Sequence, residues 1–306
     1  MTVAAIFPGQ GAQSVGMLAD VAERFPAVQD RFAQASEVLG FDVWQMVQQG
    51  PAEVLSQTEN TQPILLTAST ALWDVWQSQG ATPDYVAGHS LGEYSALVAA
   101  GALAFADGVA LVRKRGELME AAVPRGQGAM AAIMGLEDAQ IEQCCDSVAG
   151  VVAPANFNAP GQTVIAGAAQ AVADAADACK EAGAKRAVML DVSGPFHSPL
   201  MAAAKDEFAQ ALSQIELTMP TIPIVQNVSA QVPSDLQELQ ANLLQQIAAP
   251  VLWSASVKFM VDAGVEAFVE CGPGNVLAGL GRRISKATPT AATGTLEAME
   301  ALRDGS

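Results

Sequence analysis

The segment YVAGHSLGEYSALVAA, residues 85–100, contains the pattern that decides the fold. Its first three residues, Tyr85–Ala87, form a short apolar run typical of a buried strand, whereas Glu93–Ala100 has the composition of a helix. Between them, GHSLG (88–92) matches Gly-x-Ser-x-Gly, the sharp strand-to-helix turn that presents a serine nucleophile. A serine that merely caps a helix requires the same geometry, so the turn leaves both roles open for Ser90.

Short apolar runs alternate with longer helical patterns along the chain, which predicts an α/β fold with a mainly parallel sheet. The elements expected in the first part are a strand at 3–7, helices at 27–39 and 63–77, a strand at 85–87, and helices at 93–100 and 106–123. Two later apolar runs, at 224–225 and 265–269, are expected to add strands to the same sheet.

The middle of the chain has a different pattern. The elements expected there are strands at 128–134, 151–156, 163–166 and 186–191, with helices at 137–147 and 168–182. This βαββαβ order is typical of a ferredoxin-like unit, although the same strands could also continue the large sheet. We therefore predict an inserted small domain at residues 126–194, and a large catalytic domain made of residues 1–125 and 195–306.

Composition excludes several classes of protein. The 306 residues include 15 Lys and Arg against 32 Asp and Glu, a net charge of −17, which argues against nucleic-acid binding. No cation precedes Arg24 and no run of about 20 apolar residues occurs, so neither a secretory signal nor a membrane span is expected. The four cysteines (Cys144, Cys145, Cys179 and Cys271) form no C-x-x-C pair, which is typical of reduced thiols in a cytoplasmic protein.

A nucleophilic serine needs a base, and the chain has only two histidines. His89 is the immediate neighbour of Ser90, and adjacent side chains at a turn diverge. His197 lies in a loop between a predicted strand and a predicted helix, so it is the candidate base, with a purely structural histidine as the alternative.

The oxyanion formed during attack on a carbonyl needs preorganised N–H donors. The backbone N–H of Leu91, at the start of the helix after the serine, is one candidate. The loop GQGAQ (9–13) follows the first strand, and its glycines allow a close backbone approach, so it is the candidate source of a second donor. An ordinary turn between a strand and a helix would have the same composition.

Six segments of the chain, taken together, carry a family resemblance. They are PGQGAQ (8–13), GHSLGE (88–93), LVRKRGELM (111–119), NAPGQ (158–162), GPFHS (194–198) and ECGPG (270–274). In this order they resemble the malonyl-CoA:acyl carrier protein transacylases of fatty acid synthesis, over residues 3–285. The resemblance implies a hydrolase-like α/β domain with a ferredoxin-like insertion, in agreement with the pattern above.

The resemblance also implies roles for single residues. Ser90 would be the acylated serine and His197 its base. The backbone N–H groups of Gln10 and Leu91 would form the oxyanion hole. A backbone carbonyl, expected at Leu252, would orient the imidazole of His197.

The Leu252 position departs from the family pattern, because members often carry a polar residue there. A backbone acceptor does not depend on the side chain, so we expect the role to survive. Asp191 and Glu270 are alternative partners for His197, although Glu270 also fits a structural carboxylate at the end of a strand.

Arg115 matches the carboxylate-binding arginine of the family. It shares a helical face with Leu111 and Met119, and a cation in an apolar stripe needs an anionic partner. A guanidinium can hold the free carboxylate of a malonyl group through two parallel hydrogen bonds. An ion pair with an internal acid is the alternative, and Arg113 and Lys114 are expected to point into solvent.

These inferences predict a ping-pong transfer of malonyl from malonyl-CoA to the phosphopantetheine thiol of holo acyl carrier protein. Gln13 and Phe196 are expected to line the pocket, and no metal or redox cofactor is implied. The alternatives are a free-standing acyltransferase of a polyketide or polyunsaturated fatty acid synthase, a serine thioesterase or hydrolase, and a non-catalytic scaffold.

Acyl carrier proteins are themselves acidic, so a chain at −17 needs local positive charge to bind one. The two candidate docking clusters are Lys185 with Arg186, and Arg282 and Arg283 with Lys286. The alternative is that these cations belong to ordinary solvated helix faces and have no part in docking. The protein is expected to be a monomer.

Overall fold

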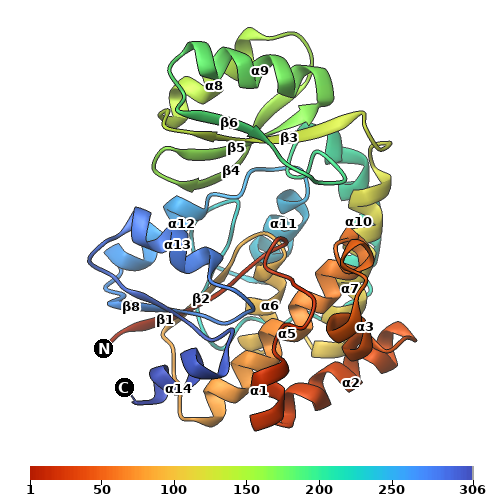
Figure 1. Cartoon of the computed structure of the whole chain (residues 1–306), viewed down its shortest axis with the longest axis vertical. Coiled ribbons are helices and arrows are strands. Elements are labelled where there is room, and N and C mark those ends of the chain that lie inside the picture. The colour runs from red at the N-terminus through yellow and green to blue at the C-terminus, as the bar shows by residue number, and fades with distance from the viewer. Residues whose placement is uncertain (305–306) are drawn as a thin grey trace.

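The computed structural model describes residues 1–304, which form a larger body with a smaller layer of helices and strands above it (Figure 1). The five-stranded sheet of the larger body has the order β7-β2-β1-β8-β9, and every neighbouring pair is parallel. Its strands are β1 (Val3–Phe7), β2 (Tyr85–Gly88), β7 (Ile224–Val225), β8 (Ala267–Glu270) and β9 (Thr290–Ala292). The parallel sheet and the two late strands at 224–225 and near 265–269 are confirmed.

The carboxyl ends of β1 and β2 determine where the site lies. The two central strands pair in register, with Phe7 opposite Gly88, so the loops that follow them leave the same edge of the sheet. In parallel sheets, ligands bind at this edge. The fold therefore places the loop at 9–13 beside the serine turn.

Helices cover both faces of this sheet. They are α1 (Ala19–Arg24), α2 (Ala27–Leu39), α3 (Val43–Gln49), α4 (Ala52–Leu55), α5 (Thr58–Ser78), α6 (Gly92–Ala99), α7 (Phe105–Ala121), the 3-10 turn η1 (Pro199–Met201), α10 (Ala202–Leu212), α11 (Leu236–Gln246), α12 (Trp253–Asp262), α13 (Val276–Ile284) and α14 (Leu296–Asp304). In residues 1–304, none of the helices has both the length and the apolar character that crossing a bilayer requires.

The start of α5 differs from the sequence prediction of 63–77. The helix begins at Thr58, so Pro63 lies inside it. Proline has no N–H, which leaves the carbonyl of Glu59 without its intrahelical donor. Nη1 of Arg113 donates to that carbonyl at 3.2 Å, so the neighbouring helix α7 supplies the missing bond.

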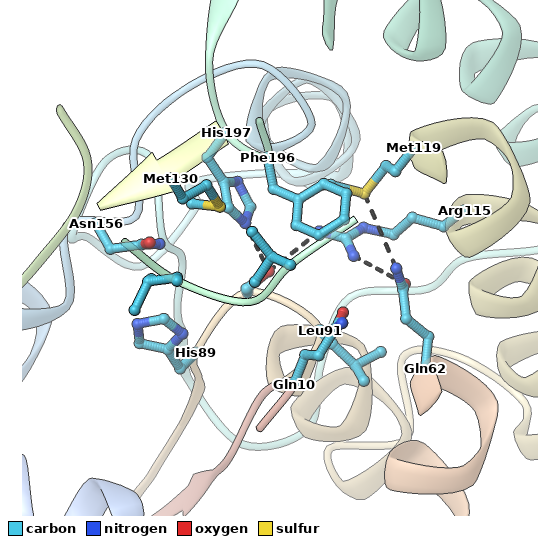
Figure 2. A pocket seen from close by; sticks show the side chains of 13 residues that line it. Gln10, Gln62, His89, Leu91, Arg115, Met119, Met130, Asn156, Phe196 and His197 are labelled. Carbon is cyan, nitrogen blue, oxygen red and sulfur yellow. Dashed lines mark hydrogen bonds between the residues drawn. The ribbon is translucent and has the colours of Figure 1, made fainter. Parts of the chain in front are cut away.

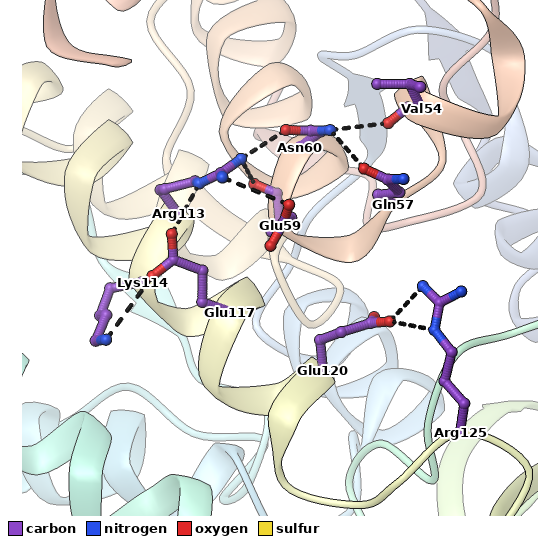
Figure 3. A network of polar contacts seen from close by, with 9 residues as sticks. All are labelled: Val54, Gln57, Glu59, Asn60, Arg113, Lys114, Glu117, Glu120 and Arg125. Atoms are coloured by element: carbon purple, nitrogen blue, oxygen red, sulfur yellow. Dashed lines mark hydrogen bonds and ion pairs between the residues drawn. The ribbon is translucent and has the colours of Figure 1, made fainter. Parts of the chain in front are cut away.

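Arg113 is also the centre of a polar network between α5 and α7 (Figure 3). Its guanidinium donates to the side chain of Asn60 and forms ion pairs with Glu59 and Glu117. The expectation that Arg113 points into solvent is therefore wrong, because the carbonyl freed by the proline draws the cation against α5.

The smaller layer consists of a four-stranded antiparallel sheet with the order β4-β5-β3-β6. Its elements in chain order are β3 (Gly128–Met134), α8 (Asp138–Ser147), β4 (Val152–Ala159), β5 (Gln162–Ala168), α9 (Ala169–Glu181) and β6 (Arg186–Met189). The βαββαβ pattern is confirmed, and the alternative that these strands continue the large sheet is wrong. The boundaries at 126 and 194 stay predictions.

The two layers share a short stretch of backbone pairing. Val251 of the larger body accepts a hydrogen bond from the N–H of Phe157 and donates one to the carbonyl of Ala155, both at 2.9 Å. Val251 thus forms a parallel bridge to the outer strand β4. This bridge fixes the segment between α11 and α12 against the small sheet.

Candidate active site

The turn after β2 holds Ser90 in a strained backbone conformation, with φ at 53°. A Cβ at Gly88 would lie 1.8 Å from the carbonyl carbon of Gly92, and one at Gly92 would lie 2.0 Å from the carbonyl oxygen of Phe7. Both positions therefore need glycine. The N-cap of α6 is Leu91, with no side-chain cap, so the alternative that Ser90 caps the helix is wrong.

Ser90 and His197 form a hydrogen-bonded pair, although 107 residues separate them in the chain. The serine Oγ lies 2.6 Å from Nε2 of the imidazole, and Nδ1 lies 2.7 Å from the backbone oxygen of Gln246. A carbonyl only accepts, so Nδ1 carries the proton and Nε2 is free to accept from the serine. Burial, followed by the nearby charge of Arg115, lowers the pKa of His197 to about 3, which keeps the imidazole neutral.

The expectation that Leu252 orients His197 is wrong. The Leu252 carbonyl already accepts from the N–H and the hydroxyl of Ser256, one turn into α12. The acceptor is Gln246, the last residue of α11, because carbonyls in the last turn of a helix have no intrahelical donor. Asp191 and Glu270 do not replace it: Asp191 is exposed, and the carboxylate of Glu270 accepts from backbone N–H groups at the start of α13.

His89 faces away from the nucleophile, as expected of adjacent side chains at a turn. Its Nε2 lies 2.7 Å from the side-chain oxygen of Asn158, and its ring packs against Trp253. Burial lowers the pKa of His89, so it too is neutral. His197 is therefore the histidine that contacts Ser90.

Arg115 is 1% exposed and points at the same hydroxyl (Figure 2). Its Nη2 lies 3.3 Å from Oγ of Ser90 and 2.9 Å from the side-chain oxygen of Gln246, while Nη1 donates to the side-chain oxygen of Gln62 at 2.8 Å. Tyr94 places its ring 5.3 Å from the guanidinium. In the described part of the chain these hydrogen-bond partners include no carboxylate, so the alternative of a direct internal ion pair is wrong.

A cavity of about 140 Å³ opens beside these three groups. Its walls are largely apolar and include Leu91, Met119, Met130 and Phe196 (Figure 2). Met130 comes from the small sheet and the other three from the larger body, so the cavity lies between the two layers. Phe196, predicted to line the substrate pocket, lies on the wall of this cavity.

The two glutamines of the loop at 9–13 have different surroundings. Gln10 lines the cavity, and within residues 1–304 neither its backbone N–H nor that of Leu91 donates a hydrogen bond to the protein. Gln13 is not among the lining residues, because its side-chain oxygen accepts from the N–H of Gly11 at 2.8 Å. The expectation that Gln13 lines the pocket is therefore wrong: the turn at Gly11, with φ of 102°, directs that side chain back onto its own loop.

Residues from both predicted docking clusters meet at the surface. Lys185, Arg186 and Arg283 line one open cavity together with the turn at 160–161. Arg282 and Lys286 are exposed but do not line it. We call the first three residues the basic patch.

Gln62 and Gln246 were missed by sequence reasoning, yet both hold Arg115. Each is at most 2% exposed. A carboxamide among buried helix residues is a usable signal, because it must find hydrogen-bond partners inside the protein. Nothing in the sequence alone indicates which partner each one has.

Comparison with known proteins identifies acyltransferases with a similar sequence. The acyl transferase domain family matches residues 5–298. The malonyl CoA-acyl carrier protein transacylase of Escherichia coli K12 is 52% identical over 299 residues, covering 97% of both chains. The corresponding protein of Bacillus subtilis is 44% identical over 301 residues, covering 97% of this chain and 95% of its own.

Solved structures give the same result. An acyl carrier protein S-malonyltransferase from Vibrio cholerae superimposes with a TM-score of 0.96 at 50% identity, covering 99% of this chain and 100% of its own. A malonyl-transacylase in complex with the holo acyl carrier protein of a type II polyketide synthase gives 0.98 at 47% identity, with both chains fully covered. The chain thus belongs to the malonyl-CoA:acyl carrier protein transacylases, within the acyl transferase domain family.

Proposed function

We propose that this chain transfers a malonyl group from malonyl-CoA to the phosphopantetheine thiol of holo acyl carrier protein in fatty acid biosynthesis, through a malonyl ester of Ser90. One observation carries the proposal. The hydroxyl of Ser90 contacts both Nε2 of His197, at 2.6 Å, and Nη2 of Arg115, at 3.3 Å. A general base and a receptor for a carboxylate therefore converge on one nucleophile.

In the first half-reaction, Ser90 Oγ attacks the thioester carbonyl while Nε2 of His197 takes the hydroxyl proton. The oxyanion is stabilised by the backbone N–H groups of Gln10 and Leu91. When the intermediate collapses, the C–S bond breaks and His197 returns its proton to the CoA thiolate. The second half-reaction runs in reverse order. The carrier thiol loses its proton to His197 and attacks the ester carbonyl, the C–O bond to Ser90 breaks, and His197 returns the proton to the serine oxygen. Neither half-reaction needs a metal or redox cofactor.

Arg115 holds the malonyl carboxylate during both half-reactions and so orients the thioester carbonyl beside Ser90. It also affects the base, because its positive charge is one cause of the low pKa of His197. The bound carboxylate offsets that charge, so substrate binding raises the basicity of His197 when it must accept a proton. Phe196, on the cavity wall, limits the space beside the malonyl methylene.

Acyl carrier protein docks on the basic patch, with Arg282 and Lys286 extending the positive surface. The support is electrostatic: three cations line one cavity in a molecule of net charge −17, which would otherwise repel an acidic partner. The chain acts as a monomer in the cytoplasm. The four free, buried cysteines are consistent with a reducing compartment.

A carrier protein of a polyketide synthase is the second candidate acceptor. The observation that favours it is the near-complete structural match to a malonyl-transacylase bound to such a carrier. Parallel transfer assays with the two kinds of holo carrier decide between the acceptors.

Intact-protein mass spectrometry tests the proposed reaction. After mixing with malonyl-CoA, the protein should gain one malonyl group on the Ser90 peptide, and holo acyl carrier protein should remove it. Ser90→Ala should show no adduct. Release of free malonate faster than transfer to the carrier would instead favour a hydrolase.

A further inference from the structure

The side chain of Gln246 links the base to the carboxylate receptor. Its oxygen accepts from Nη2 of Arg115 at 2.9 Å, and its backbone oxygen accepts from Nδ1 of His197 at 2.7 Å. The side-chain nitrogen donates to the backbone oxygen of Ser90 at 3.0 Å and to the carboxylate of Glu93 at 2.8 Å. Gln246 therefore contacts all three groups of the site: His197 through its backbone oxygen, and Arg115 and Ser90 through its carboxamide.

Asn227 fixes the serine turn in a similar way. Its side-chain oxygen accepts from the N–H of Ser90 at 2.7 Å, and its side-chain nitrogen donates to the carbonyl of Gly88 at 2.6 Å. Its own backbone N–H donates to Glu93 Oε2 at 3.0 Å, the same oxygen that accepts from Gln246. One carboxylate oxygen thus anchors both supports of the site.

Glu93 is fully buried, and its three hydrogen-bond partners in the described residues are all neutral N–H donors, the third being the side chain of Gln226 at 3.1 Å. An unpaired buried carboxylate is costly, and a neutral side chain would fill the same space more cheaply. Burial raises the pKa of Glu93 to about 7, but all three of these partners donate, so the contacts fit the ionised form, in which both oxygens accept, and not an amide. The carboxylate therefore forces the NH₂ end of Gln246 toward itself and leaves the oxygen end for Arg115.

We infer that Glu93 is a positioning residue for malonyl transfer: by fixing the carboxamide of Gln246, it directs the guanidinium of Arg115 at the nucleophile and so favours donors that carry a carboxylate. The inference deepens the proposed function and rests on it. Glu93 does not touch the reacting atoms and acts through Gln246 and Asn227.

The central test is Glu93→Gln, which keeps the size of the side chain and removes one acceptor. We expect kcat/KM for malonyl-CoA to fall about tenfold. The kcat/KM for acetyl-CoA should fall less, because only malonyl-CoA uses the orientation of Arg115. In an Arg115→Ala background, Glu93→Gln should change the malonyl-to-acetyl ratio less than about twofold, since the group it acts through is gone.

Glu270→Gln is the matched control, because Glu270 is equally buried and its carboxylate, within residues 1–304, accepts only from backbone N–H groups, at the start of α13. It should lower thermal stability and leave the donor ratio unchanged. A ratio for Glu93→Gln within twofold of the wild type would make Glu93 a purely structural residue and overturn the inference.

If Glu93→Gln does not fold, Gln246→Met tests the same inference. It removes the carboxamide and keeps the backbone carbonyl that orients His197, so it should lower the same ratio, and an unchanged ratio would overturn the inference. Failure of the wild-type protein to form a malonyl ester would instead reject the proposed function itself.

Discussion

At the scale of single residues, two features of the surroundings keep His197 neutral: its burial and the guanidinium of Arg115. We expect its imidazole to stay unprotonated from about pH 8 to about pH 5, well below the ordinary histidine midpoint. Removing the positive charge in Arg115→Ala lowers the cost of an imidazolium, so the pKa of His197 should rise. Because the chain has two histidines, nitrogen NMR can follow both side chains. An unchanged midpoint in the variant would contradict this account.

Arg115 should also determine the choice of donor. In Arg115→Ala the malonyl carboxylate loses a charge-assisted hydrogen-bond donor, whereas an acetyl group never uses it. We expect kcat/KM for malonyl-CoA to fall about 100-fold or more, and the preference to shift toward acetyl-CoA. Competition between the two donors, read by mass spectrometry of the Ser90 peptide, measures this. If the variant still favoured malonyl-CoA, the role assigned to Arg115 would be wrong.

At the scale of elements, Pro63 and Arg113 should be energetically coupled, because the cation bonds to the carbonyl that the proline leaves free. Arg113→Ala should cost about 1–3 kcal/mol of unfolding free energy. Pro63→Ala should recover part of that loss, since alanine restores the helical N–H donor to Glu59. Urea unfolding of both single variants and the double variant gives the coupling energy. Strictly additive effects would show that the two residues act independently.

The elements also show how far sequence reasoning reached. The helix at 27–39 was predicted with both ends correct, and the glycine-flanked serine turn was located, because local patterns encode both. The start of α5 was missed because a bond from another helix supports the turn before Pro63. Strand β9 was not predicted, since its three residues, Thr290–Ala292, have no alternation and depend on pairing with β8.

The difference between features encoded locally and features that depend on long-range contacts also applies to the site. Ser90 and His197 were predicted because the glycine-flanked turn marks the serine and the chain has only one other histidine, whereas Arg115 was predicted from the family resemblance and its apolar helical face. Gln246 was not, because its contribution comes from a backbone carbonyl and from a carboxamide orientation that exist only after folding. Residue identity predicts which side chains react, whereas long-range contacts decide what holds them.

At the scale of the whole molecule, charge should govern docking of the carrier. Arg283→Glu, alone and with Lys286→Glu, should reduce kcat/KM for acyl carrier protein about fivefold or more and leave acylation by malonyl-CoA within about twofold. Added salt should narrow the difference. Lys114→Glu is the control, because it changes the net charge as much as Arg283→Glu does. Its helix, α7, lies on the opposite side of the molecule from α13, which carries Arg283 (Figure 1). Equal losses for both variants would point to net charge, and unchanged carrier kinetics would remove the docking proposal.

The bridge between Val251 and strand β4 has a practical consequence for recombining such enzymes. Val251 lies five residues after Gln246, whose backbone carbonyl holds the imidazole. An insertion swapped in from a relative would therefore bring a foreign sheet edge against the segment that aligns the base. Chimaeras should transplant residues 246–253 together with the insertion, so that β4 and the segment that pairs with it come from the same protein.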